Sequence, residues 1–340
     1  MNRTKFIKDF LTSSETAMKM LMLFATVLAV IFPTILFAWA VRAEAAQDKS
    51  PQDLVAQAAQ ALRQRKFREA AELATQAIEQ KPDLAEAYVV RGQARGGMGQ
   101  LKEAIADFTK AIELKQDATT YLVRGNAYSE LDEHAKSLAD FDQALKLDPK
   151  ARGAYRQRGR TNFKAGKVEP SIADFDRYVE LEPEHENDLW ERGLSRYYAG
   201  QFRQAQNSFE DYHKVGPDDT ENDLWRMLSQ AEADGLAEAQ KVLKTLHAKR
   251  GGIFPPMYDL YTGKIKPDEA FTRATADAAN DRKSQDFYAH LYVGMWFVAA
   301  RDKPKSIEHL EQAVALRSTD YMWYVARLQL ERLKRAEKSK

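Results

Sequence analysis

Apolar residues recur along most of this chain at intervals of three and four, the spacing at which they share one face of a helix. The pattern predicts pairs of amphipathic helices, each about 14 residues long, joined by short turns. These pairs run from about residue 51 to 249 and resume at about 285. Proline, which cannot continue a helix, closes three of the pairs at Pro149, Pro183 and Pro217. The pattern therefore predicts an all-α fold built from helical hairpins.

The predicted hairpins repeat one another at a nearly constant interval along the chain. Four of them carry Arg-Gly at the same place, with glycines at Gly92, Gly125, Gly159 and Gly193. A small residue follows each glycine at one fixed spacing, and a phenylalanine follows at a second: Ala104, Ser137, Ser171 and Ala205, and Phe108, Phe141, Phe175 and Phe209. The small residues let the two helices of a hairpin approach closely, and the Phe fills the space between neighbouring units. A single hairpin cannot bury its own apolar face, so the hairpins are expected to stack in series.

This arrangement is similar to the tetratricopeptide repeat (TPR), whose pattern is W-x2-L-G-x2-Y…A-x3-F…P at a period of roughly 34 residues. Tyr88, Tyr121 and Tyr155 take the first, aromatic position. The resemblance implies a right-handed α-solenoid in which the first helix of each unit lines the concave side. In this register the array covers 51–249, with units at 51–84, 85–117, 118–151, 152–185 and 186–219 and a degraded unit at 220–249.

The remainder of the chain divides into three parts. They are a connecting segment at 250–284, a last TPR-like hairpin at 285–318, and a capping helix with a tail at 319–340. Gly-Gly and Pro-Pro interrupt the connecting segment, which is expected to contain one helix from about Pro267 to Ala279.

Residues 256–334 carry a resemblance of their own. This stretch includes "MYDLYTGKIKPDEAF" and "DYMWYVARLQLERL", and it resembles the C-terminal half of periplasmic lipoproteins of the NlpI type. The resemblance implies a scaffold that brings envelope proteases and cell-wall hydrolases together. It also allows a homodimer contact through Tyr321, Trp323 and Tyr324. The chain departs from that family because it has no cysteine to carry a lipid.

The N-terminal part of the chain resembles a targeting region. Residues 20–41 carry no charged side chain. As a helix they would span roughly 33 Å, against roughly 30 Å for the hydrocarbon core of a bilayer. Positive charges within 1–19 place this n-region in the cytoplasm, and 42–50 link the segment to the array. The segment is an uncleaved transmembrane anchor, favoured by its length, or a signal peptide cut at "AWA" or "AEA". A buried core helix in a cytoplasmic protein is the third alternative. The first two alternatives predict a single-pass inner-membrane protein with a periplasmic TPR domain, or a periplasmic protein.

The composition of the chain limits the kinds of binding site and catalytic activity that it can have. The formal net charge of +1 gives no overall field that favours nucleic acid. The absence of cysteine excludes thiol catalysis and thiolate zinc sites. The six histidines show no metal-binding spacing, and the glycine-rich "GGMGQ" lacks the Lys and Ser/Thr of a phosphate-binding loop. We therefore expect no enzymatic activity, no metal and no cofactor.

A second regularity places an Asp at one fixed spacing after the Arg of three Arg-Gly pairs. We interpret these residues as ion pairs that join the two helices of a unit. The pairs are Arg91 with Asp107, Arg124 with Asp140, and Arg158 with Asp174. In the following unit Ser208 replaces the Asp, so Arg192 is expected to be free or to use another partner.

The TPR register also selects residues for the concave side, at positions 2, 5, 9, 12 and 13 of each first helix. The candidates are Asn126, Arg156, Arg160, Phe163, Lys164, Trp190, Tyr197 and Tyr198. A basic cluster beside an aromatic cluster suits an extended or helical peptide with an acidic patch. The alternative is that some of these side chains pack against the next helix instead.

These observations predict a non-enzymatic TPR adaptor of the bacterial cell envelope that binds protein or peptide segments in its concave groove. Two alternatives remain open. One is a homo-oligomeric structural scaffold joined through the aromatic residues near the C-terminus, and the other is an accessory subunit of an envelope enzyme complex.

Overall fold

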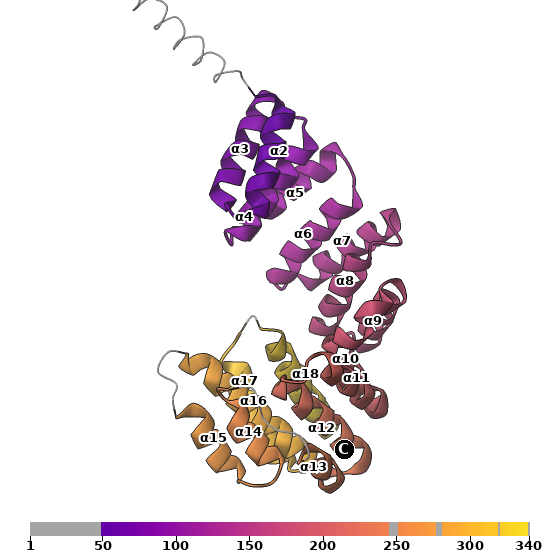
Figure 1. Ribbon diagram of the computed structural model, residues 1–340, viewed down its shortest axis with the longest axis vertical. Coiled ribbons are helices and arrows are strands. Elements are labelled where there is room, and N and C mark those ends of the chain that lie inside the picture. Colours follow the sequence, from indigo (N-terminus) through magenta and orange to yellow (C-terminus); the bar gives the residue numbers. More distant parts are fainter. Residues whose placement is uncertain (1–48, 245–250, 277–280, 319, 339–340) are drawn as a thin grey trace, which may run out of the picture.

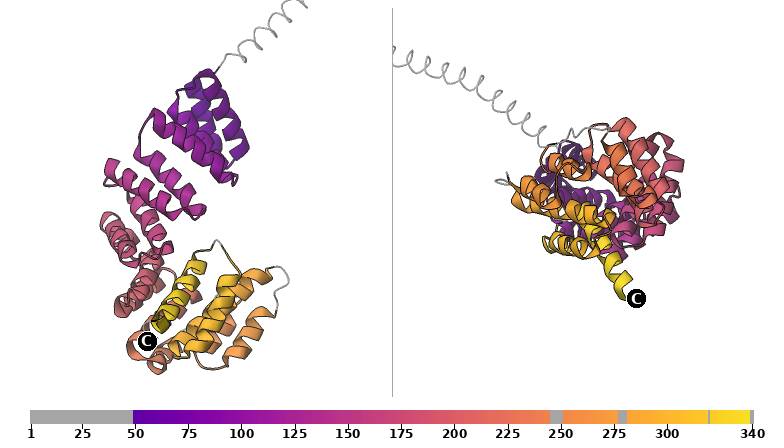
Figure 2. Two further views of the ribbon diagram at one scale, coloured as in Figure 1. Left: turned by 180° about the vertical axis from the view of Figure 1, so that it is seen from behind. Right: turned by 90° about the horizontal axis from the view of Figure 1, so that it is seen from below.

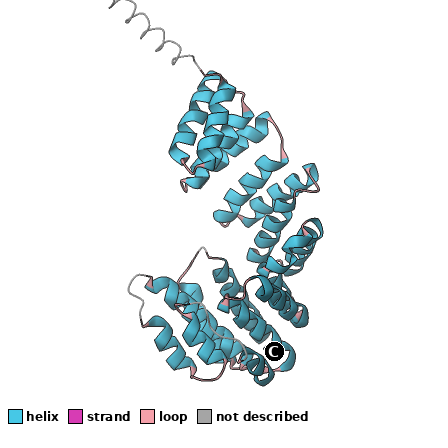
Figure 3. Cartoon of the chain, in the orientation of Figure 1, coloured by secondary structure: helices cyan, strands magenta, loops and turns pink. Residues whose placement is uncertain are grey.

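The computed structural model describes residues 49–244, 251–276, 281–318 and 320–338. Within these ranges the chain forms helices and short turns and contains no strand (Figure 3). The predicted membrane or signal segment at 20–41 lies outside them. None of the helices in the described ranges is long and apolar enough to cross a bilayer.

The helices form five consecutive hairpins in the N-terminal part of the chain (Figure 1). They are α2 (Pro51–Arg63) with α3 (Phe67–Gln80), α4 (Ala85–Gly97) with α5 (Leu101–Leu114), α6 (Ala118–Glu130) with α7 (His134–Leu147), α8 (Arg152–Lys164) with α9 (Val168–Leu181), and α10 (Trp190–Tyr198) with α11 (Phe202–Val215). A short 3-10 helix, η1 (Pro183–Asp188), precedes α10. Each hairpin packs on the next, which is how the amphipathic helices bury their apolar faces.

The repeated glycines set the distance between the two helices of a hairpin. A Cβ added at Gly92 would lie 2.6 Å from the Phe108 ring, and one at Gly125 would lie 2.8 Å from the Phe141 ring. Real Cβ atoms do not approach other carbons so closely, so only glycine lets the second helix seat its phenylalanine. This is the physical reason for the Gly and Phe spacing in the sequence.

The turn inside each hairpin also follows the repeat. At the same place after each repeated glycine the backbone is left-handed, with φ of 78° at Gly99 and 76° at both Gly166 and Gly200. Asp132 and Arg301 occupy this place in their own hairpins, with φ of 59° and 62°. The turn at Arg301, in the last predicted hairpin, therefore has the same left-handed geometry as the turns of the N-terminal hairpins.

The C-terminal half continues the helical stack and then turns back. Its helices are α12 (Thr220–Asp234), α13 (Leu236–Leu243), α14 (Phe254–Tyr261), α15 (Pro267–Thr275), α16 (Arg282–Ala299), α17 (Lys303–Ala315) and α18 (Tyr321–Lys338). The segment 250–284 thus contains two helices, α14 and α15, where the sequence predicted one. Pro255 and Pro256 lie in the first turn of α14, where proline is tolerated, so the Pro-Pro pair opens a helix instead of marking a loop.

The last helix closes the fold. α18 packs against α17 on one side and against α8 on the other. In Figure 1 it lies between the array and the α14–α17 group, far from α2–α5, and the view from behind in Figure 2 shows the same order. One continuous apolar core consequently runs from Phe163 to Leu330, whereas the first units hold small, separate clusters around residues such as Ala58 and Ala74.

Candidate protein-binding surface

The eight predicted groove residues lie on first helices, but they do not form one open surface. Asn126 comes from α6, four others come from α8, and Trp190, Tyr197 and Tyr198 come from α10. Five of the eight contact α18 or lie against its side chains, as the following contacts show. The remaining three are Asn126, Arg156 and Tyr197.

Tyr321, the first residue of α18, occupies an aromatic site on the array. Its ring stacks on Phe163 at a centroid distance of 5.2 Å and meets Trp190 edge-on at 5.3 Å. The guanidinium carbon of Arg160 lies 5.6 Å from the centre of the same ring. Three predicted groove residues therefore bind a side chain of the same molecule.

The next turns of α18 bind the array through polar groups. The Tyr198 hydroxyl donates to the Val325 carbonyl at 3.0 Å. Lys164 Nζ lies 5.0 Å from the centre of the Tyr324 ring, and the Tyr324 hydroxyl donates to the Asp132 carboxylate. These contacts fix α18 along the C-terminal end of α8 and beside the turn between α6 and α7.

These contacts correct the prediction of an open groove at Arg160, Phe163, Lys164, Trp190 and Tyr198. The residues do form a surface for a helix, but the helix is α18. Two of the three residues predicted for a homodimer contact are buried within their own chain: Tyr321 and Tyr324 are 7% and 2% exposed, and Trp323 donates to the Val314 carbonyl at 3.0 Å. The homodimer itself stays a prediction.

The prediction that Tyr197 faces the groove is also wrong, because its side chain belongs to the core. Its side chain is 1% exposed and packs against Phe202 and Trp225, each at a centroid distance of 5.5 Å. Burial raises the pKa of the Tyr197 hydroxyl above its usual value. The alternative prediction therefore holds at Tyr197: the side chain packs between helices instead of facing a groove.

Arg156 and Asn126 are half-buried and lie beside the part of the concave side that α18 covers. Arg156 Nη2 and Arg160 Nε both lie 3.7 Å from Glu191 Oε1, longer than a hydrogen bond, and Glu191 is 1% exposed. Arg156 Nε and Glu191 Oε2 have no hydrogen-bond partner among the described residues. The arginine side chains are each 35% exposed, so they retain donors that a bound carboxylate could use.

The structure brings together each of the predicted Arg and Asp residues. The closest N to O distances are 2.7 Å for Arg91 with Asp107, 2.8 Å for Arg124 with Asp140 and 2.6 Å for Arg158 with Asp174. The three aspartates are 3%, 5% and 4% exposed. The hydrogen bonds that Arg124 donates to Asp140 raise the pKa of Arg124, so the guanidinium stays charged inside the array.

These arginines also join neighbouring units, a contact that the spacing of Arg and Asp within one unit does not predict. Arg124 Nη1 donates to Thr109 Oγ1 at 3.0 Å, and Arg158 Nη1 donates to Asp142 Oδ1 at 2.6 Å. Arg192, which lacks an Asp in its own unit, donates to Asp176 of the preceding unit at 2.7 Å. The acceptors Thr109, Asp142 and Asp176 follow one another at the period of the repeat. This regularity is visible in the sequence and could have identified them.

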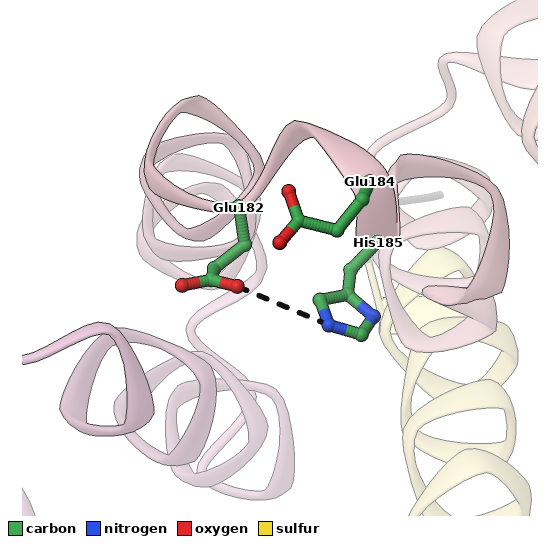
Figure 4. A group of neighbouring side chains, drawn as sticks. All are labelled: Glu182, Glu184 and His185. Carbon is green, nitrogen blue, oxygen red and sulfur yellow. Dashed lines mark ion pairs between the residues drawn. The ribbon is translucent and has the colours of Figure 1, made fainter.

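One cluster has the composition of a cation site. Glu182, Glu184 and His185 lie together at η1, with His185 Nε2 3.9 Å from Glu182 Oε2 (Figure 4). The members already have other partners, since Glu182 pairs with Arg152 and His185 Nδ1 lies 2.8 Å from Asp188 Oδ2. The hydrogen bond to Asp188 raises the pKa of His185 and favours the imidazolium, which cannot bind a metal. We interpret the cluster as ion pairs that stabilise η1.

Comparison with known proteins agrees with this geometry. Models of the tetratricopeptide repeat match residues 85–117 and 122–186. A curated relative, described as a protein SGT1 homolog of Oryza sativa subsp. japonica, is 56% identical over 48 residues, which are 14% of this chain and 13% of the relative's length.

Solved structures resemble a larger share of the chain at lower identity. A tetratricopeptide repeat protein from Parabacteroides merdae aligns with 82% of this chain and 98% of its own, at 15% identity and a TM-score of 0.51. The C-terminal part of a TPR repeat-containing protein from Cytophaga hutchinsonii covers 80% of this chain at 16% identity and a TM-score of 0.46. The described part of the chain therefore has an all-α fold similar to that of a TPR solenoid, and residues 85–117 and 122–186 match tetratricopeptide repeats.

Proposed function

We propose that this protein is a non-enzymatic adaptor of the bacterial cell envelope that holds a segment of a partner protein on the concave side of α4, α6 and the start of α8, beside the area that α18 covers. The observation that carries the proposal is the position of α18. The concave side of α8 and α10 already holds a helix through aromatic, cation–π and backbone contacts. The neighbouring first helices have the same geometry and remain outside the area that α18 covers (Figure 1).

The chemistry next to α18 favours an acidic segment. Arg156 and Arg160 are half-exposed, and their only described carboxylate partner, Glu191, lies at 3.7 Å from both. One carboxylate does not neutralise two guanidinium groups. A partner that brings an Asp or Glu to the exposed part of the Arg156 guanidinium would complete this charge balance.

Site-specific photo-crosslinking in cells tests the proposed surface. A benzophenone amino acid at Asn126, on the concave side, is expected to give a discrete protein adduct. The matched control places it at Lys146, which is exposed on α7, the second helix of the same unit. Adducts of equal yield from both positions, or none from Asn126, would contradict a concave binding surface.

The envelope location is inferred from residues 20–41 and the positive charges before them. N-terminal sequencing of the mature chain distinguishes the anchor from the cleaved signal peptide. Protease treatment of spheroplasts tests the location itself, since a periplasmic array is digested while the inner membrane remains intact. Protection of the array under those conditions would place the protein elsewhere.

The role of an accessory subunit, suggested by the NlpI-type resemblance of 256–334, is a special case of this adaptor function. An adduct that contains an envelope protease or a cell-wall hydrolase would support it.

A further inference from the structure

A cavity of about 240 Å³ lies where the first turn of α18 meets α10, α11, α12 and α16. It is smaller than the pockets of roughly 300–1,000 Å³ that hold drug-sized ligands, so it suits a single functional group on a short stem. Half of its lining residues are aromatic: Trp190, Phe209, Trp225, Tyr288 and Tyr321. The cavity is distinct from the Arg156 region in the proposed function.

Three buried polar groups in the wall have no hydrogen-bond partner among the described residues: Asn222 Oδ1, the Tyr321 hydroxyl and Trp225 Nε1. The first two can accept a hydrogen bond, whereas Trp225 Nε1 is a donor. Asn222 is 4% exposed, and its Nδ2 donates to the Phe209 carbonyl at 2.7 Å, but its Oδ1 accepts nothing. The Tyr321 hydroxyl is also buried without a partner. Leaving buried polar atoms unpaired costs free energy, so the cavity is built to receive a hydrogen-bond donor.

The charge of the lining selects the kind of donor. Asp219, Glu221 and Asp320 line the cavity, and the described lining residues include no Lys, Arg or His. Asp320 accepts from the Tyr288 hydroxyl and from the Met322 N–H, both at 2.8 Å, and both of these donors are neutral. Arg160 lies over the Tyr321 ring, but it does not line the cavity and it faces Glu191.

We propose that this cavity binds an organic cation that carries N–H donors, an alkylammonium or a guanidinium group on an apolar stem. The faces of the two tryptophan rings attract a cation, and the stem contacts the rings and Met322. The N–H groups donate to Asn222 Oδ1 and toward the carboxylates. A quaternary ammonium has no N–H, so it satisfies the rings but not Asn222.

Such a ligand would join α18 to the array. Asp320, Tyr321 and Met322 come from the start of α18, whereas Asn222 and Trp225 come from α12. A cation that contacts both sides binds only while α18 is docked, so its binding stabilises the docked state by mass action.

Calorimetric titration of the full chain in detergent micelles tests the proposal. The probes are n-butylammonium, n-propylguanidinium, tetramethylammonium and the neutral butan-1-ol. The two N–H cations are expected to bind at least tenfold more tightly than butan-1-ol and more tightly than tetramethylammonium. Equal binding of butan-1-ol would overturn the proposal, because a merely apolar cavity does not select charge.

Two matched variants test whether the cations bind in this cavity. Asp320→Asn removes the charge but leaves a good N-cap residue for α18, and it is expected to weaken binding of n-butylammonium at least fivefold. Asp302→Asn makes the same change at the cap of α17, outside the cavity, and is expected to leave binding unchanged. Circular dichroism checks that both variants keep their helices, and equal affinities in the two variants would refute the assignment.

A last comparison identifies the source of the cation. The capped tripeptide acetyl-Gly-Arg-Gly-amide binds as tightly as n-propylguanidinium if the cavity receives an arginine side chain of a partner protein. If only the free cations bind, a small soluble amine is the ligand. Either outcome supports the cation chemistry, and failure of all charged probes to bind more tightly than butan-1-ol rejects it.

Discussion

Removal of the Asp140 carboxylate is expected to destabilise the array severely. Asp140 is 5% exposed and accepts two hydrogen bonds from Arg124, from Nε and from Nη2, each at 2.8 Å. In Asp140→Ala the guanidinium loses its counter-charge while its side chain remains only 16% exposed. The variant therefore leaves a charge in a poorly solvated place.

The size of the loss follows from what Arg124 retains. Breaking a buried pair from one side costs about 3–5 kcal/mol. Arg124 keeps its hydrogen bond to Thr109 at 3.0 Å and its position near the rings of Tyr121 and Tyr128, at 5.6 and 5.9 Å. We therefore expect the lower end, about 3 kcal/mol.

Asp142→Ala on the same helix is the control. Asp142 pairs with Arg158 at 2.6 Å, but its side chain is 60% exposed and Arg158 also binds Asp174. The expected loss is under about 1 kcal/mol. Both losses are measured by urea unfolding followed by circular dichroism, together with hydrogen exchange of α6 and α7, because the units of a repeat array can open separately.

The result that would refute the reasoning is a loss below about 0.5 kcal/mol for Asp140→Ala, the range of an exposed pair. The double variant Arg124→Met with Asp140→Leu tests the cause. It is expected to recover most of the lost stability, because apolar residues of similar size often replace a buried pair at little cost.

Two further predictions concern packing and pH. Gly125→Ala places a Cβ 2.8 Å from the Phe141 ring and is expected to cost about 1–3 kcal/mol, whereas Gly96→Ala meets no atom within 4 Å and is expected to stabilise α4 by up to about 1 kcal/mol, both measured by urea unfolding. Burial and the neighbouring His309 lower the pKa of His290 to about 4, below the value near 6.5 of an unfolded chain. The unfolded state thus binds more protons, so stability is complete above about pH 6.5 and falls as the pH drops toward 4, by on the order of 1 kcal/mol after allowance for solvent screening. His290→Gln should flatten this part of the pH profile, and an unchanged profile would contradict the assignment.

The regular part of the fold could be predicted from the sequence because each unit is determined by contacts within about 34 residues. Gly125 and Phe141 meet because their spacing places them on facing helices, and Arg124 meets Asp140 for the same reason. The α14 helix was not predicted, because Pro-Pro is more common in turns than in the first turn of a helix.

The occupation of the concave side could not be predicted from local patterns. Tyr324 and Asp132 are 192 residues apart, and Arg327 and Lys164 are 163 apart. Such contacts depend on the accumulated curvature of many units, and a small change in the angle between hairpins would separate them. The spacing of Tyr321 and Tyr324 places their rings on one face of α18, but it does not identify the helix that this face meets.

The difference between the two halves of the core bears on where a partner binds. In the first units the buried clusters consist largely of alanine, such as Ala58, Ala74 and Ala77, and each cluster is separate. Alanine buries little apolar area, so these units gain less stability from packing than the aromatic core that runs from Phe163 to Leu330. Segments with few buried contacts open and adjust at lower cost in free energy. We therefore expect the N-terminal hairpins to adjust more readily than the C-terminal half, which α18 closes, to the protein segment that we propose binds there.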